Sequence, residues 1–312
     1  MKMKAKAQFL SRPIGLFILL SITSTQVVHA LAFRTDILDG EQNYIDLAKP
    51  YNSVARATGN GYIGTGFLAS PTKFITAGHL VDLDQDGVVE SSTYTARFST
   101  TGSGFDNTFT ASSVDVHPLY SSSSRYDIAV FTFSTPIAGY TPMTISTADP
   151  LGQLGTMVGY GLHGDGATFG TTSSVDSVRR AAENIIDTQD SRFYLTDFDK
   201  ASEDTSTYGT ATPLLLEGTS ARGDSGGPLI VDGAVIGIVQ GGYSNPYGEI
   251  SEYGDRATWV KLNDPDIIAF LEDDHGITVV PEPSVFALAW ISLFYLGTRR
   301  RLPRERADME IS

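Results

Sequence analysis

The chain has 312 residues, no cysteine, and 36 Asp and Glu against 22 Lys and Arg. Most of the excess acid lies in residues 31–280, which hold 13 basic and 32 acidic residues, a formal charge of −19. A surface of this charge repels phosphate backbones and anionic lipids, so nucleic acid is excluded as a partner of this region. Without disulfides, the stability of the fold must come from its core.

The first 30 residues have the three parts of a secretory signal peptide. Four basic residues come first, an apolar run follows at 13–20, and a small-residue cleavage site ends at Ala30. The apolar run is shorter than the roughly 20 residues that a membrane-spanning helix needs. We therefore predict export and cleavage after Ala30, with Ala32 as the alternative edge.

Short apolar segments bounded by Gly, Ser, Thr and Asp predict an all-β domain. The expected strands are residues 61–70, 73–76, 128–133, 156–161, 229–231, 234–240 and 257–262. Residues 231–234 have the pattern of a hairpin turn, and residues 181–186 are the one helix-like stretch before residue 222. Asp264 and Pro265 predict the start of a helix that runs to about Glu272.

An acidic segment lies just after position 80 of the sequence. Asp82, Asp84 and Asp86, with Gly87 behind them, match the start of an EF-hand-type loop, in which oxygen ligands at alternate positions suit calcium. Position twelve of such a loop is Thr93 instead of a glutamate. The pattern predicts an abbreviated structural calcium loop, and a solvated acidic turn is the alternative.

Three segments supply the residue types of nucleophilic catalysis. His79 follows an apolar run, Asp127 stands at the head of an alternating strand, and Ser225 lies in Gly-Asp-Ser-Gly-Gly-Pro at 223–228. A hydroxyl needs a base to take its proton, and a carbonyl under attack needs donors for its developing charge. Glycines beside Ser225 let the amides of Gly223 and Ser225 point at such an oxyanion.

The order His, Asp, Ser differs from that of subtilisins and of α/β-hydrolases. Together with Thr-Ala-Gly-His at 76–79, His-Pro-Leu-Tyr at 117–120 and Gly-Ile-Val-Gln-Gly-Gly at 237–242, it resembles the trypsin-like (chymotrypsin-fold) serine proteases over residues 37–272. The resemblance implies two packed antiparallel Greek-key β-barrels with a short C-terminal helix, over a protease domain at 37–275. It also implies polypeptide substrates, no required cofactor, and a Ser225–His79–Asp127 triad.

The same resemblance assigns the substrate-binding residues Thr219, Gln240 and Gly242. Thr219 occupies the pocket-floor position at which trypsins carry an aspartate, so we expect cleavage after uncharged, small to medium side chains. Glu217 lies close by in the sequence. Gln240 stands where the family usually has a serine that hydrogen-bonds the triad aspartate.

Residues 37–40, Ile-Leu-Asp-Gly, resemble the segment that begins mature trypsin-like enzymes. In that family the freed amine pairs with the aspartate before the nucleophile. The resemblance therefore implies a short propeptide at 31–36 and an activation ion pair between Ile37 and Asp224.

Pro-Glu-Pro at 281–283, an apolar run at 285–296 and arginines at 299–301 resemble a PEP-CTERM sorting signal over residues 279–301. This resemblance implies a Gram-negative bacterium, an exosortase-type processing enzyme as partner, and transient contact of the segment 276–312 with the inner membrane. The arginines would stay on the cytoplasmic side. The expected destination is the periplasm, the cell surface or the medium, and a plain C-terminal anchor is the alternative.

Two other functions fit parts of the sequence. Gly223 and Gly227 around Ser225 also match the nucleophile elbow of esterases, with His275 as the base and an acid among Asp232, Asp255 and Asp264. That fold needs alternating strands and helices before the serine, which the chain does not show. The other alternative is a surface or matrix binding protein that keeps a protease fold with an inert Ser225.

Overall fold

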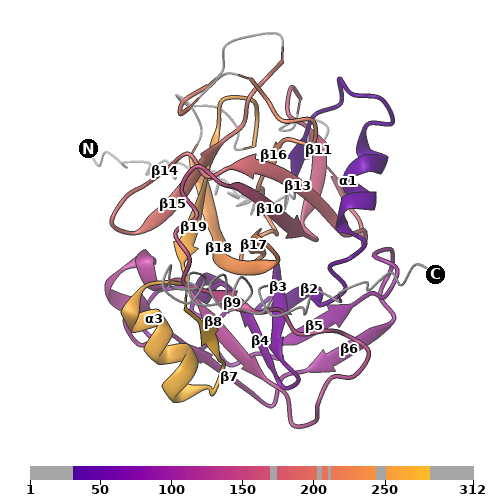
Figure 1. Ribbon diagram of the computed structural model, residues 1–312. Helices are drawn as coiled ribbons and strands as arrows, with labels where there is room; N and C mark the ends of the chain where they lie inside the picture. Colours follow the sequence, from indigo (N-terminus) through magenta and orange to yellow (C-terminus); the bar gives the residue numbers. More distant parts are fainter. Residues whose placement is uncertain (1–30, 169–173, 202–205, 210–211, 244–250, 282–312) are drawn as a thin grey trace, which may run out of the picture.

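The computed structural model describes residues 31–168, 174–201, 206–209, 212–243 and 251–281. Most of the described strands form two curled, mainly antiparallel sheets, one from each half of the domain, which pack against each other (Figure 1). A short helix at the C-terminal end lies against the first of them. This arrangement confirms the predicted all-β fold of two antiparallel barrels with a C-terminal helix.

The first barrel contains the strand order β6-β5-β2-β3-β4-β8-β7. Its core includes the fully buried rings of Phe74, Phe98 and Phe131, and the Phe74 ring centroid lies 5.9 Å from that of Phe98 and 5.7 Å from that of Phe131. The strand bounds are β2 Val54–Gly59, β3 Tyr62–Ser70, β4 Lys73–Thr76, β5 Thr95–Phe98, β6 Asn107–Thr110, β7 Ser113–Val116 and β8 Ala129–Thr132.

The second barrel has the order β13-β10-β17-β18-β19-β15-β14, and two short strands, β9 and β20, join it beside β18. Trp259 is fully buried in its core. The bounds are β9 Ile145–Ser146, β10 Leu154–Gly159, β13 Arg180–Ile185, β14 Thr188–Gln189, β15 Phe193–Asp197, β17 Pro228–Val231, β18 Ala234–Tyr243, β19 Arg256–Lys261 and β20 Val279–Val280.

A third, small sheet holds the start of the described chain. Strand β1 (Ala32–Phe33) lies between β11 (Leu162–Asp165) and β16 (Gly218–Thr219), and β12 (Ser174–Val175) pairs with the other edge of β11. Leu31, Ala32 and Phe33 are at most 3% exposed. Because both edges of β1 are paired, this segment is an integral part of the fold.

Two helices differ from the sequence expectations. Residues 181–186 do not form a helix: most of them belong to β13, which pairs with β10 from Leu154↔Ile185 to Gly159↔Arg180. The helix-favouring composition of this stretch is overridden by pairing and burial in the sheet. Helix α1 (Glu41–Ala48), which packs on β13 and buries Tyr44, was not predicted.

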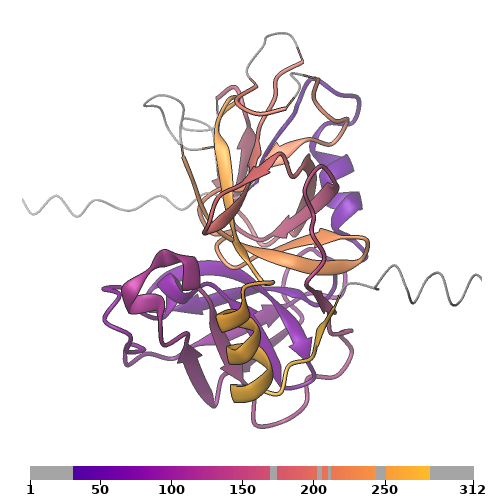
Figure 2. The same ribbon diagram turned by 60° about the vertical axis from the view of Figure 1, so that its left-hand side comes forward.

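The expected C-terminal helix is present. It begins at Asp264, whose carboxylate accepts a hydrogen bond from the Asp266 amide, runs through α3 (Pro265–Ala269), and continues in a wider π-helical turn to Asp274. It buries Ile267, Phe270 and Leu271, and Figure 2 shows it against the first barrel. Among the described residues, no helix has both the length and the apolar character needed to cross a membrane.

Candidate active site

The structure brings His79 and Asp127 together at the mouth of the first barrel. His79 lies in a single helical turn (Gly78–Leu80) that follows β4. Asp127 lies two residues before the start of the neighbouring strand β8. The His79 amide donates to Asp127 Oδ1 at 2.8 Å, and His79 Nδ1 lies 2.7 Å from Asp127 Oδ2. The carboxylate therefore holds both the backbone and the ring of the histidine, which leaves Nε2 for other partners.

Burial and charge act in opposite directions on His79. Burial disfavours the imidazolium and lowers the pKa, whereas the charge of Asp127 and its hydrogen bond favour the imidazolium. The carboxylate prevails, so the pKa of His79 is raised above its ordinary value of 6.5. The Asp127 side chain is 1% exposed, whereas that of His79 is 33% exposed, so the histidine remains reachable from solvent.

The turn that carries Ser225 is pressed against the strand end that carries His79. Gly226 has a φ of +81°, and a Cβ on it would lie 2.4 Å from Ala77 N and 2.5 Å from Thr65 O. The Thr65 amide donates to Ser225 O at 2.9 Å, and the Gly226 amide donates to Val239 O at 2.8 Å. Only glycine fits this contact, and it places Ser225 next to the segment leading to His79.

The amides expected to hold an oxyanion are available. In residues 212–243, the amides of Asp224, Gly226 and Gly227 donate to backbone carbonyls, whereas those of Gly223 and Ser225 donate to no described group. No hydrogen bond joins Ser225 Oγ to His79 among the described residues. In the absence of substrate such catalytic hydrogen bonds are often loose, so the lack of a hydrogen bond between Ser225 and His79 is compatible with catalysis.

Asp224 is a buried carboxylate with only backbone donors. Its Oδ1 accepts from the Gly161 amide at 3.3 Å and its Oδ2 from the Ala221 amide at 3.1 Å. Gly159 makes room for it, because a Cβ there would lie 1.8 Å from Asp224 Oδ1. Burial raises the pKa of Asp224 to about 7, while the two amides and the charge of Arg180 act weakly against this.

The residues assigned to substrate binding lie along β16 and β18. Thr219 is 1% exposed in β16, paired with Ala32, and Gly242 lies on β18. Gln240 Oε1 accepts from the Thr258 hydroxyl at 3.0 Å, and the described hydrogen bonds to the Asp127 carboxylate come from His79 alone. The Gln240 side chain therefore does not take the serine's place in supporting Asp127.

Two other predicted neighbours of the site are directed elsewhere. The carboxylate of Glu217 is buried and accepts hydrogen bonds from the amides of Asp199 and Leu214, both at 2.6 Å. His275 packs edge-on against Phe270 on the C-terminal helix and lines a cavity with Lys73. His275 thus belongs to a different surface from the Ser225 turn, which argues against the esterase arrangement.

Strand β18, which contains the expected substrate-binding residues Gln240 and Gly242, extends further than the sequence predicted. Strand β18 pairs with β17 as far as Ile238, and Val239 still exchanges backbone hydrogen bonds with Gly226 and Gly227. Beyond Val239, the described pairing of β18 is with β19 alone, so an open edge begins just after Val239, beside the Ser225 turn. An open edge of this kind can receive an extended peptide. The sequence signal for it was the long run of apolar residues and glycines that continues past the predicted strand end at Gln240.

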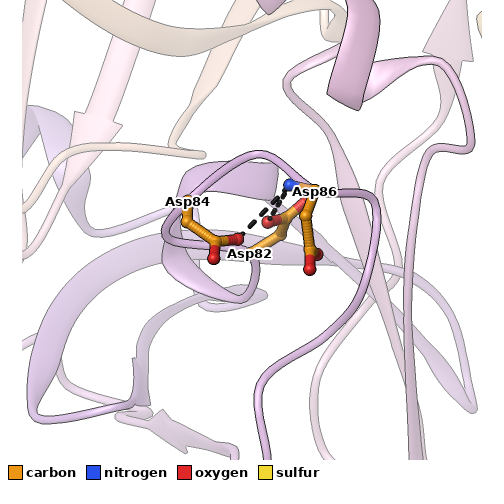
Figure 3. A group of neighbouring side chains, drawn as sticks. All are labelled: Asp82, Asp84 and Asp86. Carbon is orange, nitrogen blue, oxygen red and sulfur yellow. Dashed lines mark hydrogen bonds between the residues drawn. The ribbon is translucent and has the colours of Figure 1, made fainter.

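The acidic segment folds as a compact loop (Figure 3). Ligand atoms of Asp82, Asp84 and Asp86 all lie within 4.8 Å of one another. Asp82 is fully buried, and its two carboxylate oxygens accept from the amides of Asp86 and Gly87. The loop begins at Asp82, three residues after His79.

Comparison with known proteins shows the family of this chain. Residues 38–255 match the family model described as Trypsin, and the chain therefore belongs to the trypsin family of serine proteases. A protein described as "Trypsin" from Saccharopolyspora erythraea is 26% identical over 192 residues, which cover 57% of this chain and 74% of the relative. A solved structure of Glu endopeptidase in complex with MPD shares the fold, with a TM-score of 0.50 and 20% identity over 73% of this chain and 94% of that one.

The Asp127–His79 contact predicts a particular titration of the imidazole. In NMR spectra of the purified protein, we expect the His79 ring, assigned by its loss in His79→Gln, to titrate with a midpoint above 6.5. In Asp127→Asn the midpoint should fall below 6.5, because burial remains and the stabilising charge is gone. A wild-type midpoint at or below 6.5, or one unmoved by Asp127→Asn, would contradict the assignment.

Proposed function

We propose that this protein is a secreted serine endopeptidase that uses Ser225, His79 and Asp127 to hydrolyse peptide bonds. The observation that carries the proposal is the seating of the Ser225 turn against Ala77 and Thr65, beside a histidine fixed by a buried carboxylate. Membership of the trypsin family supports the same reaction. Acidic charge on the domain is compatible with a peptide substrate and not with nucleic acid.

In this mechanism Ser225 Oγ attacks the scissile carbonyl carbon while His79 Nε2 takes its proton. Asp127 keeps the remaining ring proton on Nδ1 and stabilises the imidazolium. The free amides of Gly223 and Ser225 bind the oxyanion. In subtilisin, one such donor stabilises the transition state by about 2.7–4 kcal/mol. His79 then protonates the leaving amine, and a water molecule activated in the same way releases the acyl group from Ser225.

For specificity, we retain the proposal of uncharged, small to medium side chains before the cleaved bond. Thr219 offers a neutral floor, and Gly242 leaves the neighbouring wall without a side chain. Glu217 does not compete for a basic side chain, because its carboxylate already accepts two amides, and burial raises its pKa to about 7.

A fluorophosphonate probe tests the triad on protein that begins at Leu31. We expect Ser225 to be labelled, and His79→Ala to reduce labelling and peptide hydrolysis by a factor on the order of 10⁴ or more, because the base is lost. His275→Ala, matched in chemistry but on another surface, should label normally. Labelling that survives His79→Ala would overturn the triad, and a folded protein that does not label would favour the inert binding protein.

The start of the active chain is the second part of the proposal. In this structure residues 31–33 are buried in the small sheet, so removal of residues 31–36 as a propeptide would delete β1, leave β16 without its strand partner and open one edge of β11. Ile37 itself packs at the edge of the second barrel's core. The resemblance pairs the amine of Ile37 with Asp224, whereas the burial and pairing of residues 31–33 support the amine of an earlier residue as the partner of Asp224.

Strand register points to Leu31 as that amine. Ala32 pairs with Gly164 on one side and Thr219 on the other, so Leu31, one residue earlier, lies between residues 163 and 220. Asp224 accepts from the amides of Gly161 and Ala221, immediately beyond these two neighbours. Cleavage after Ala30 would therefore release an ammonium group beside Asp224. We propose that removal of the signal peptide alone completes the oxyanion hole.

A comparison of two chain starts tests this ion pair. We expect protein beginning at Leu31 to be active, and protein with a few residues retained before Leu31 to be much less active. At pH 8 Asp224→Asn should lower the melting temperature of the first form, because an ion pair is lost. It should raise that of the second, because an unpaired buried carboxylate is removed.

The sign follows from the pKa of Asp224. Without a nearby ammonium, burial raises this pKa to about 7, so the folded extended form binds a proton more tightly than the unfolded chain and loses stability as the pH rises from about 4 to 7. An ion pair with Leu31 would lower the pKa and reverse this dependence. Equal effects of Asp224→Asn on both forms, or full activity of the extended form, would refute the role of Leu31.

We also propose calcium binding at Asp82, Asp84 and Asp86, the group of carboxylates in Figure 3. Addition of about 5 mM EDTA, above the dissociation constants of extracellular calcium modules, should lower the melting temperature, and excess calcium should restore it. An Asp84→Asn, Asp86→Asn double variant should not respond to EDTA. An unchanged melting temperature in the wild type would leave a solvated acidic turn.

Export and sorting remain proposals that rest on sequence. The signal peptide at 1–30 and the motif and apolar run at 282–312 lie outside the described residues. Their order still supports a route in which the chain is exported, held in the inner membrane of a Gram-negative bacterium by residues 285–296, and released or relocated by an exosortase-type enzyme. β20 ends at Val280, so such a cut would fall just after the last described strand.

A further inference from the structure

A cationic and aromatic groove lies at the far end of the open β18 edge. It has a volume of about 480 Å³ and is bounded on one side by the β14–β15 hairpin and on the other by Tyr208, Tyr243 and Arg256. Tyr243 is the last residue of β18 and lies opposite Arg256 of β19. The groove therefore shares Tyr243 with the strand whose open edge begins beside the Ser225 turn.

Arg256 is held in place without neutralisation of its charge. Its guanidinium lies 5.7 Å from the Tyr243 ring centroid and 6.0 Å from that of Tyr208, and its Nη1 donates to the Tyr208 hydroxyl at 3.2 Å. Its buried Nε has no hydrogen-bond partner. In the described part of the chain no carboxylate lies within 4 Å of this guanidinium, although the domain carries a formal charge of −19.

Other charges around the groove leave it positive. Arg192, on the opposite wall, has Nη2 at 3.7 Å from Asp190 Oδ2, with both side chains more than 40% exposed, so this pair is weak. Lys261 donates to the Asp190 carbonyl. Asp197 is the cross-strand neighbour of Arg256, but its Oδ2 accepts from the amides of Thr207 and Tyr208. Of the residues that line the groove, an incoming carboxylate would meet the guanidinium groups of Arg192 and Arg256 and the carboxylate of Asp190, whereas Asp197 is buried behind Arg256.

We infer that this groove binds an acidic side chain of the substrate, three or four residues before the cleaved bond, with Arg256 as the residue that recognises it. The inference rests on the proposed endopeptidase function. Val239, which binds the Ser225 turn just before the open edge, lies four residues before Tyr243, a strand distance of about 13 Å. An antiparallel peptide on this edge, with its reactive carbonyl at Ser225, reaches the groove with its third or fourth preceding residue.

Paired substrates test the groove. From a peptide that the enzyme cleaves in a protein digest, two quenched versions are made that differ only by Glu or Gln at the third, and in a second pair the fourth, residue before the cut. In one of the two pairs we expect kcat/KM for Glu to exceed that for Gln by about five- to tenfold, mostly through KM, as for a partly exposed charge-assisted contact. High salt should reduce the ratio.

Variants assign the effect to Arg256. Arg256→Gln should bring the Glu/Gln ratio close to one, and Arg256→Lys should restore part of it, because a positive charge returns without the fork of donors. Lys49→Gln removes one positive charge from the exposed end of α1 and should leave the ratio unchanged. Melting temperatures of all three variants show whether they fold.

Two outcomes overturn the inference: equal rates for Glu and Gln in both pairs, or a ratio that persists in Arg256→Gln. Binding of the same peptides to Ser225→Ala gives a second measurement that does not require turnover. If the wild type cuts nothing in the digest, the Glu and Gln pairs are built on an uncleaved peptide; tighter binding of the Glu versions to Ser225→Ala would then leave the groove standing while the endopeptidase proposal fails. Cleavage without discrimination would remove the groove alone.

Discussion

The site depends on the hydrogen bonds that Thr65 makes at the seam of the two barrels. Thr65 is fully buried in β3 of the first barrel. Its amide donates to Ser225 O, its hydroxyl donates to Gly223 O at 2.8 Å, and the same hydroxyl accepts from the Tyr160 amide at 3.1 Å. One side chain thus attaches the nucleophile turn and the end of β10 to the barrel that holds His79. Because these groups are buried and paired, the seam has one low-energy arrangement.

This seam explains how much of the fold and the site the sequence could predict. Local signals were sufficient for β4, for the turn between β17 and β18, and for the Asp264 cap, because each is set by neighbouring residues. The residue types of the proposed triad and their order in the chain could be read directly from the sequence. The helix prediction for residues 181–186 was wrong because their partners on β10 lie about 25 residues earlier in the chain, and pairing overrode the helix-like composition.

Other features of the site could not be read from local sequence because they are made by contacts between distant segments. The motif at residues 37–40 resembled a mature N-terminus, but burial is concentrated six residues earlier, in a strand whose two partners come from residues 162–165 and 218–219. Gln240 could have reached Asp127 by length alone, whereas its partner is Thr258 on the next strand. In both cases the register of a sheet, which no single segment specifies, decided the contact.

Charged side chains in the buried interior have hydrogen-bond partners that differ from those at the open edge of β18. Buried carboxylates such as Asp127 and Asp82 accept hydrogen bonds from backbone amides, so they fix backbone geometry. Arg256 differs, because its charge is positioned by two tyrosines and left without an acid. Folding alone gives no reason to keep such a charge uncompensated at the end of an open strand edge. A peptide that adds to this edge supplies the missing carboxylate, which links the shape of β18 to the choice of substrate.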